Sequence, residues 1–272
     1  LSIEGFKLAS DDSKIVLSMS TFLECESLNC SADKFAAQKA KPNAGKVYNQ
    51  LMVRHWASWT DGSYKHLYVA DITNKPITKV TDVTAGLATD SPAKPFSGME
   101  EVTFTPDNKH IVYTAKAPSV TQASHTNYDL WQVDVTGKTR INLTENNQAW
   151  DAHPTFSPDG RYMAYVAMEK PGAESDRFAI MLKDLVTGTV KEVAPLWDRS
   201  ARQVMFAPDS RNLIVTAQDI GQVSVFMINI QFGDIKQIQG EGSSSIIGVA
   251  GNDVVIKKKA LNNPGQLYKV SF

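Results

Sequence analysis

Three stretches of this chain repeat one pattern without a gap: Phe104-Thr-Pro-Asp-Asn-Lys-His-Ile-Val-Tyr-Thr-Ala115, Phe156-Ser-Pro-Asp-Gly-Arg-Tyr-Met-Ala-Tyr-Val-Ala167 and Phe206-Ala-Pro-Asp-Ser-Arg-Asn-Leu-Ile-Val-Thr-Ala217. Proline sets φ at the second position of a turn, and Asp followed by Asn, Gly or Ser favours a tight reversal. The residues after each turn are mostly apolar on both faces, as expected for strands covered on both sides. The pattern predicts a repeated β-hairpin.

The repeat has a period of 52 and then 50 residues, counted between its phenylalanines. A related version lies at Leu8 to Met19, and a shortened one lies near Val249 to Ile256. This period is typical of a four-stranded propeller blade. A β-sandwich is the alternative, but a sandwich gives no reason for one turn sequence to recur in register.

A second pattern follows each hairpin at a similar distance. Each copy holds a strand that ends in Asp or Asn, then a polar turn and a return strand, which together form the outer strand pair of a blade. The copies are Leu67 to Thr81, Leu130 to Thr144, Ile180 to Ala194 and Val225 to Gln239. Inner and outer pairs give four complete blades, and Leu267 to Phe272 begins the outer pair of a fifth.

We therefore predict an all-β fold, a β-propeller of four-stranded blades with about five blades present in an incomplete ring. The blades are expected near residues 1–85, 98–145, 150–195, 199–240 and 244–272, within a single propeller domain or fragment spanning 1–272. An open ring exposes a sheet edge, which natural proteins avoid, so we expect that flanking sequence is missing.

The first blade carries an insertion at residues 21–62. Within it, Ala32 to Lys41 favours a short helix that Pro42-Asn43-Ala44-Gly45 ends. Cys25 and Cys30 are the only cysteines. Bonded to each other they would close a small loop, stabilise the fold by about 2 kcal/mol and indicate an oxidising compartment. The residues alone leave this pairing and two ordinary thiols equally open.

Composition limits the partners. The 272 residues are 42% hydrophobic, which is enough for a substantial core. Lys plus Arg number 28 against 29 for Asp plus Glu. This balance favours neither nucleic acid nor a membrane surface as a partner. Apolar runs stay far below the ~20 residues that span a bilayer.

The sequence motifs predict no catalytic residue in this chain. The sequence has no Gly-x-Ser-x-Gly nucleophile motif and no glycine-rich phosphate loop, so we predict no hydrolase site and no cofactor. The five histidines show no zinc-type spacing, which argues against a metal site. His153, directly before an inner strand, is placed to face the central channel, although a structural role is favoured.

Two features are candidates for recognition. Glu100 and Glu101 precede the strand at Phe104, where they could receive a cationic group such as a peptide amino terminus. The favoured alternative is a solvated pair of charges in a loop. Arg54, His55 and Trp56, with a second tryptophan nearby, combine a bidentate donor with aromatic surface. The favoured alternative is an insertion that its own tryptophans anchor to the blade.

Certain segments resemble a known family: Val53-Arg-His-Trp-Ala-Ser-Trp-Thr-Asp-Gly62, the Cys-x-x-x-x-Cys insertion, and Ala149-Trp-Asp-Ala-His-Pro-Thr-Phe-Ser-Pro-Asp-Gly160 followed by Asp176-Arg177-Phe178. They are similar to the propeller of bacterial acylaminoacyl-peptidase and dipeptidyl-peptidase-like members of the prolyl oligopeptidase superfamily. The resemblance covers nearly the whole chain. The Phe-Ser-Pro-Asp-Gly repeat itself is less specific, because TolB-like propellers share it.

The resemblance implies a propeller of roughly seven or eight blades in front of an α/β-hydrolase domain with a Ser, Asp and His triad. None of the triad maps onto this chain. The propeller of such a periplasmic or secreted peptidase caps the catalytic cavity, admits short peptides and helps to bind their amino-terminal part. The expected partners are that hydrolase domain of the same polypeptide and a short peptide substrate. The alternative is a stand-alone TolB-like propeller that serves as a protein-interaction scaffold.

Overall fold

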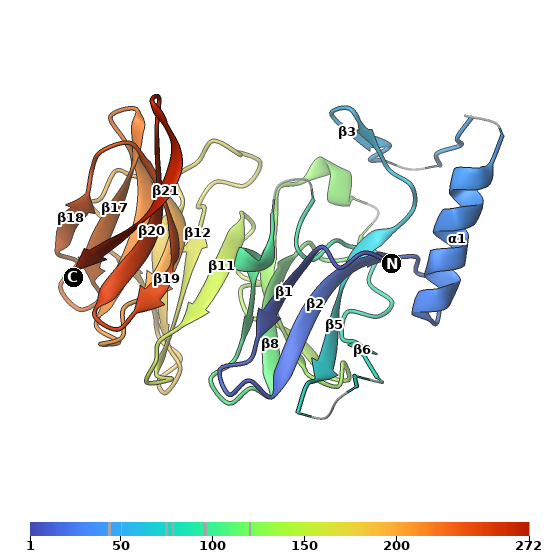
Figure 1. Cartoon of the computed structure of the whole chain (residues 1–272), viewed down its shortest axis with the longest axis horizontal. Helices are drawn as coiled ribbons and strands as arrows, with labels where there is room; N and C mark the ends of the chain where they lie inside the picture. Colours follow the sequence, from blue (N-terminus) through green and yellow to red (C-terminus); the bar gives the residue numbers. More distant parts are fainter. Residues whose placement is uncertain are drawn as a thin grey trace. The chain divides into compact units, whose positions relative to one another are not determined.

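The computed structural model describes residues 1–42, 45–49, 51–73, 76–77, 79–94, 97–119 and 121–271. The chain forms two compact units, Leu1–Asn146 and Asn147–Phe272, and each is described by itself (Figure 1). Two residues of the predicted helix-ending segment, Asn43 and Ala44, lie outside the described residues, as does Phe272 of the last predicted strand.

The first unit holds two antiparallel four-stranded sheets, each with its strands in chain order. Two 3₁₀ turns, η1 (Met99–Glu101) and η2 (Gln122–Ser124), lie in its connections. The first sheet contains β1 (Gly5–Leu8), β2 (Lys14–Thr21), β5 (Tyr64–Asp71) and β6 (Thr81–Asp82). The second contains β7 (Val102–Phe104), β8 (His110–Ala115), β9 (Asp129–Asp134) and β10 (Arg140–Asn142).

The second unit continues the same plan. Its four-stranded sheet contains β11 (Asp151–Phe156), β12 (Tyr162–Ala167), β13 (Ala179–Asp184) and β14 (Val190–Val193). Its seven-stranded sheet contains β15 (Ala201–Phe206), β16 (Asn212–Asp219), β17 (Gln222–Asn229), β18 (Ile235–Gln239), β19 (Ser243–Ala250), β20 (Asp253–Ala260) and β21 (Asn263–Ser271). One parallel pair, Val223 with Ser243, joins the four strands β15–β18 to the three strands β19–β21.

This succession of antiparallel four-stranded sheets confirms the predicted all-β propeller class. No sheet of the described residues closes on itself, in agreement with an incomplete ring. Strands β19–β21 form an antiparallel group of three, one strand fewer than the four-stranded sheets, among the described residues.

The inner hairpin turns follow from their sequence. The residue after the turn Asp adopts a positive φ, which is 55° at Asn108, 72° at Gly160 and 56° at Ser210. Asp107 and Asp159 each accept the backbone N–H two residues further along at 3.0 Å. Short polar side chains and glycine tolerate this left-handed conformation, which explains why the repeat uses them there.

The first strand of each outer pair also ends where predicted. Strands β5, β9 and β13 end at Asp71, Asp134 and Asp184, and β17 ends at Asn229. Each of these four side chains accepts the backbone N–H two residues later, at 2.8–3.0 Å. This local hydrogen bond closes the turn without help from the rest of the fold.

Apolar faces join neighbouring sheets within each unit. In the first unit, Val16 and Leu67 of the first sheet share a buried cluster with Ile111 and Tyr113 of the second. In the second unit, strand β16 uses both of its faces. Leu213 and Val215 belong to the cluster shared with β11–β14, whereas the intervening Ile214 belongs to the cluster shared with β19 and β20. A strand covered on both faces needs the continuous apolar run seen in the repeat.

The insertion forms helix α1 (Leu28–Ala40) and a small hairpin of β3 (Arg54–His55) and β4 (Ser58–Trp59). The helix begins four residues before the predicted Ala32, because Ser27 caps it by accepting the Cys30 N–H at 3.2 Å. No helix in the described part of the chain is long and apolar enough to cross a membrane.

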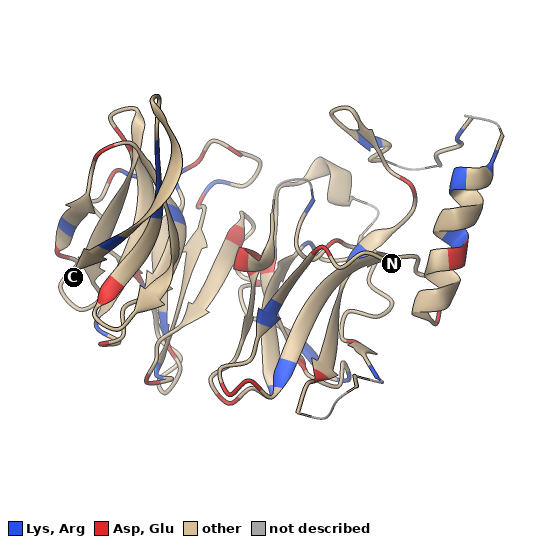
Figure 2. Ribbon diagram, viewed as in Figure 1, with Lys and Arg blue, Asp and Glu red and all other residues tan. Residues whose placement is uncertain are grey.

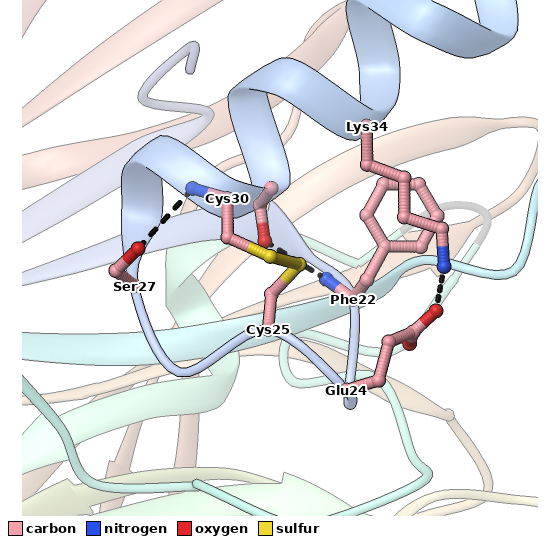
Figure 3. The surroundings of a disulfide bond; sticks show 7 residues. Phe22, Glu24, Cys25, Ser27, Cys30 and Lys34 are labelled. Atoms are coloured by element: carbon pink, nitrogen blue, oxygen red, sulfur yellow. Dashed lines mark hydrogen bonds and ion pairs between the residues drawn. A yellow bond between two sulfur atoms is a disulfide. The ribbon is translucent and has the colours of Figure 1, made fainter.

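Cys25 and Cys30 form a disulfide with an S–S distance of 2.08 Å, which ties the first turn of α1 to the segment before it (Figure 3). Beside it, Phe22 packs on Phe35 with ring centroids 4.6 Å apart. The Phe22 N–H donates to the Ser31 hydroxyl at 3.2 Å. These contacts hold the start of α1 against the end of β2.

Candidate functional site

The hairpin β3–β4 presents Arg54, His55 and Trp56 to solvent. Arg54 pairs with Trp59 across the hairpin, and its guanidinium carbon lies 5.5 Å from the centre of the Trp59 ring. It also donates a hydrogen bond to the Trp56 carbonyl at 3.3 Å. Trp56 is 75% exposed and Trp59 is 57% exposed. Both tryptophan side chains are thus largely exposed, and anchoring of the insertion to the blade by them stays a prediction.

Glu100 and Glu101 occupy η1, just before strand β7, and differ sharply in environment. Glu100 is exposed, and its Oε1 accepts the Gly98 N–H at 2.7 Å. Glu101 is fully buried, and its Oε2 accepts the Ala93 N–H at 2.8 Å. Burial raises the pKa of Glu101 to about 7, against the lowering effect of that backbone hydrogen bond. A solvated pair of charges is therefore the wrong interpretation for Glu101.

The connection that carries these glutamates lies against the start of β5. The Ser91 N–H donates to the Lys65 carbonyl at 2.9 Å, and the Lys65 N–H donates to Asp90 at 2.8 Å. Lys94 bridges Asp90, at 3.0 Å, and the Ser63 carbonyl, at 3.2 Å. Because Ser63 closes the insertion, the insertion and the η1 connection meet at one end of the first sheet.

The two groups of predicted residues lie on two separate elements, the β3–β4 hairpin and η1. Neither Arg54 nor His55 forms a hydrogen bond or ion pair with Glu100 or Glu101 in the part of the chain that the structure describes. The hairpin carries a guanidinium and aromatic rings, and η1 carries one exposed and one buried carboxyl group.

His66 is a buried group that the sequence did not single out. Its Nδ1 lies 2.8 Å from Asp82 and its Nε2 lies 2.9 Å from the Leu87 carbonyl. Burial alone would lower the pKa of His66, but the hydrogen bond and charge of Asp82 outweigh it and raise the pKa. Both ring nitrogens face acceptors, so the imidazolium form suits the site. His66 thus fixes the start of the same connection.

His153 and Gln203 lie at bulges of inner strands in the second unit. His153 does not precede an inner strand but lies within β11, at a bulge where its φ is 55°. Gln203 sits next to the corresponding bulge of β15, where its amide donates to the Ile246 carbonyl and accepts the Ile246 N–H at 3.2 and 2.8 Å. Across the described ranges, no group of three or more His, Cys, Asp or Glu side chains is placed to hold a metal ion.

Sequence comparison identifies relatives of this chain among known proteins. No family model matches the sequence. Dipeptidyl-peptidase 5 of Porphyromonas gingivalis is 30% identical over 229 residues, covering 84% of this chain and 33% of that protein. A dipeptidyl-peptidase 5 of Schizosaccharomyces pombe is 26% identical over 85% of this chain and 35% of its own length. The chain thus spans about a third of the length of these relatives.

Solved structures agree on the fold. Acylaminoacyl peptidase of Pyrococcus horikoshii matches with a TM-score of 0.67 at 14% identity, covering 100% of this chain and 37% of that one. The β-propeller domain of the trilobed protease of Pyrococcus furiosus matches with a TM-score of 0.60 at 13% identity, over 98% of this chain and 64% of that one. Together with the dipeptidyl-peptidase 5 homology and the repeated four-stranded sheets, these matches identify the chain as a β-propeller region of the prolyl oligopeptidase superfamily.

Proposed function

We propose that this chain is the non-catalytic propeller of a serine peptidase, and that it gates access of short peptides to an α/β-hydrolase domain elsewhere in the same polypeptide. The observation that carries the proposal is the homology to dipeptidyl-peptidase 5, of which the match covers only a third. The absence of a Gly-x-Ser-x-Gly motif from this sequence agrees with it, because the nucleophile must then lie in the unmatched part.

Gating follows from the rigidity of stacked sheets. Buried clusters join neighbouring sheets within each unit, so a folded protein cannot be accommodated by opening one blade alone. A short peptide can pass such a filter, and the enclosed site excludes bulk water from the acyl-transfer step. The propeller would thereby limit the size of the peptide that is admitted and keep bulk water away from the reaction.

The substrate contacts are assigned to the end of the first sheet described above. Glu100, held by the Gly98 N–H, is the carboxylate available to a peptide ammonium group. The buried Glu101 would hold the connection that carries Glu100 in place through its hydrogen bond with the Ala93 N–H. Arg54 and His55 offer donors for peptide carbonyls, with Trp56 as an apolar wall.

We also propose a periplasmic or secreted location. Disulfides persist in oxidising compartments, and the Cys25–Cys30 bond lies in the exposed insertion where reductants would reach it.

The test compares the 272-residue chain with the complete polypeptide encoded by its gene. A fluorogenic dipeptide substrate and a fluorophosphonate probe report turnover and an activated serine. We expect the complete polypeptide to cleave the substrate and to be labelled outside this region, and we expect the chain alone to do neither. Turnover by the pure chain would overturn the proposal. A complete polypeptide without a hydrolase domain would favour the TolB-like scaffold.

A further inference from the structure

The insertion hairpin and the residues before it expose several large apolar side chains to solvent. Five large side chains take part: Val47, Leu51, Met52, Trp56 and Trp59, which we call the hairpin surface. Their exposed fractions are 88, 73, 44, 75 and 57%. All five lie within residues 47–59 of the insertion, and exposed apolar side chains grouped in one segment indicate an interaction site.

Little within the hairpin itself offsets this exposure. Its strands are two residues long, and the backbone pairs are Arg54 with Trp59 and His55 with Ser58. Tyr48 stacks on Trp59 with ring centroids 5.9 Å apart, and the Thr60 N–H donates to the Val53 carbonyl at 3.0 Å. A two-stranded hairpin without a core is marginal in water. A partner surface that covers these apolar side chains would therefore stabilise the hairpin.

The charge around the hairpin indicates what that surface carries. From Lys34 to Thr60 the sequence has no Asp or Glu, although the whole chain has a net charge of -1. Figure 2 shows the basic positions in blue on α1 and the hairpin. The basic residues of this stretch are Lys34, which forms an ion pair with Glu24, and Lys39, Lys41, Lys46 and Arg54. An acidic partner is therefore favoured in approach and orientation.

We propose that the hairpin surface docks onto the catalytic domain of the same polypeptide, at an apolar hollow rimmed by carboxylates. This inference rests on the proposed function. Relatives have about two thirds of their length outside the matched region, which supplies a covering domain. A dipeptide would cover only one or two of the five side chains, whereas a domain surface covers all of them. Trp and Arg are the residues that most often dominate such contacts.

Docking at this hairpin has a consequence for the substrate contacts. The insertion ends at Ser63, whose carbonyl binds the same Lys94 that holds Asp90 of the η1 connection. A domain seated on the hairpin would therefore lie near the connection that leads to Glu100. The candidate peptide contacts would lie at the junction of the two domains, where closure brings them to the reacting centre.

The test labels both the 272-residue chain and the complete polypeptide with 5-fluorotryptophan. Fluorine NMR resolves the tryptophans, and the variant Trp56→Phe assigns the Trp56 signal. A soluble paramagnetic probe then measures its solvent exposure. Because Trp56 is 75% exposed in the chain alone, we expect its broadening by the probe to fall about fivefold or more in the complete polypeptide. Trp131, which is part-buried in the first unit, serves as the internal reference.

A charge variant and a matched control complete the design. Arg54→Glu is expected to restore the broadening of the Trp56 signal in the complete polypeptide. Lys257→Glu, the same reversal of charge at an exposed position of strand β20, is expected to leave it protected. Equal broadening in chain and complete polypeptide, with peptidase activity present, would overturn the docking but not the proposed function. Protection that appears in the chain alone at high concentration, or only with anionic vesicles, would also overturn it. A complete polypeptide without a hydrolase domain would overturn both.

Discussion

The buried carboxyl of Glu101 gives the sharpest prediction for stability. Its pKa is raised from 4.5 to about 7 by burial. The folded state therefore keeps a proton that the unfolded state releases above pH 4.5, so stability falls as the pH rises from about 4.5 to about 7 and levels off above that. At about 1.4 kcal/mol per pKa unit, full ionisation costs roughly 3 kcal/mol.

The variant Glu101→Gln removes this titration while keeping an oxygen that accepts the Ala93 N–H. The free energy of unfolding of wild type minus that of the variant should fall by about 3 kcal/mol between pH 4.5 and pH 8. At low pH the two proteins should differ little in stability, because the protonated carboxyl and the amide each place a buried donor where the wild-type Oε1 has no hydrogen-bond partner. His66 also loses stabilising charge as the pH rises, but it does so in both proteins and cancels in the difference.

Native-state hydrogen exchange on strands β7 and β8 measures this difference within the first unit, after correction for intrinsic exchange rates. Glu100→Gln is the control, because Glu100 is exposed. Its difference from wild type should stay within about 0.5 kcal/mol across the same pH range. A Glu101→Gln difference that does not change with pH would refute the assignment of a buried, proton-binding carboxyl.

Three further predictions concern the fold. Gly137→Ala should destabilise the first unit by about 1–3 kcal/mol more than Gly188→Ala destabilises the second, by hydrogen exchange, because both have φ of 76° but only the Gly137 Cβ would meet backbone, at 3.1 Å. Replacing Cys25 and Cys30 by serine should cost about 2 kcal/mol in the protection of α1, and unchanged protection would contradict this. Ile214→Ala should cost about 2–5 kcal/mol in urea unfolding of the second unit, whereas Ile214→Val should cost about 0.5–1.5 kcal/mol.

The features of the fold that could be predicted are those determined by interactions between residues close together in the sequence. Asp71, Asp134 and Asp184 end their strands because each side chain closes its own turn, so the sequence alone located those ends. The helix start was missed because Ser27 acts as a cap only once the Cys30 N–H lies above it. A polar segment around it gave no periodic signal.

The candidate site was less predictable, because its burial depends on distant contacts. Glu101 is buried where the connection folds back and brings the Ala93 N–H to its carboxyl group. The two charges of Glu100 and Glu101 look equivalent in sequence and differ entirely in the structure. Trp56 has the composition of an anchor, yet nothing in its local sequence reveals that the blade leaves it exposed.

Peptide-length selectivity of the complete polypeptide tests the gating account most directly. One cleavable sequence is presented as a free short peptide and within an exposed loop of a stably folded protein, and kcat/KM is measured for both. The account predicts efficient cleavage of the free peptide and none of the folded protein. Cleavage of both at similar kcat/KM would contradict a propeller that filters substrates.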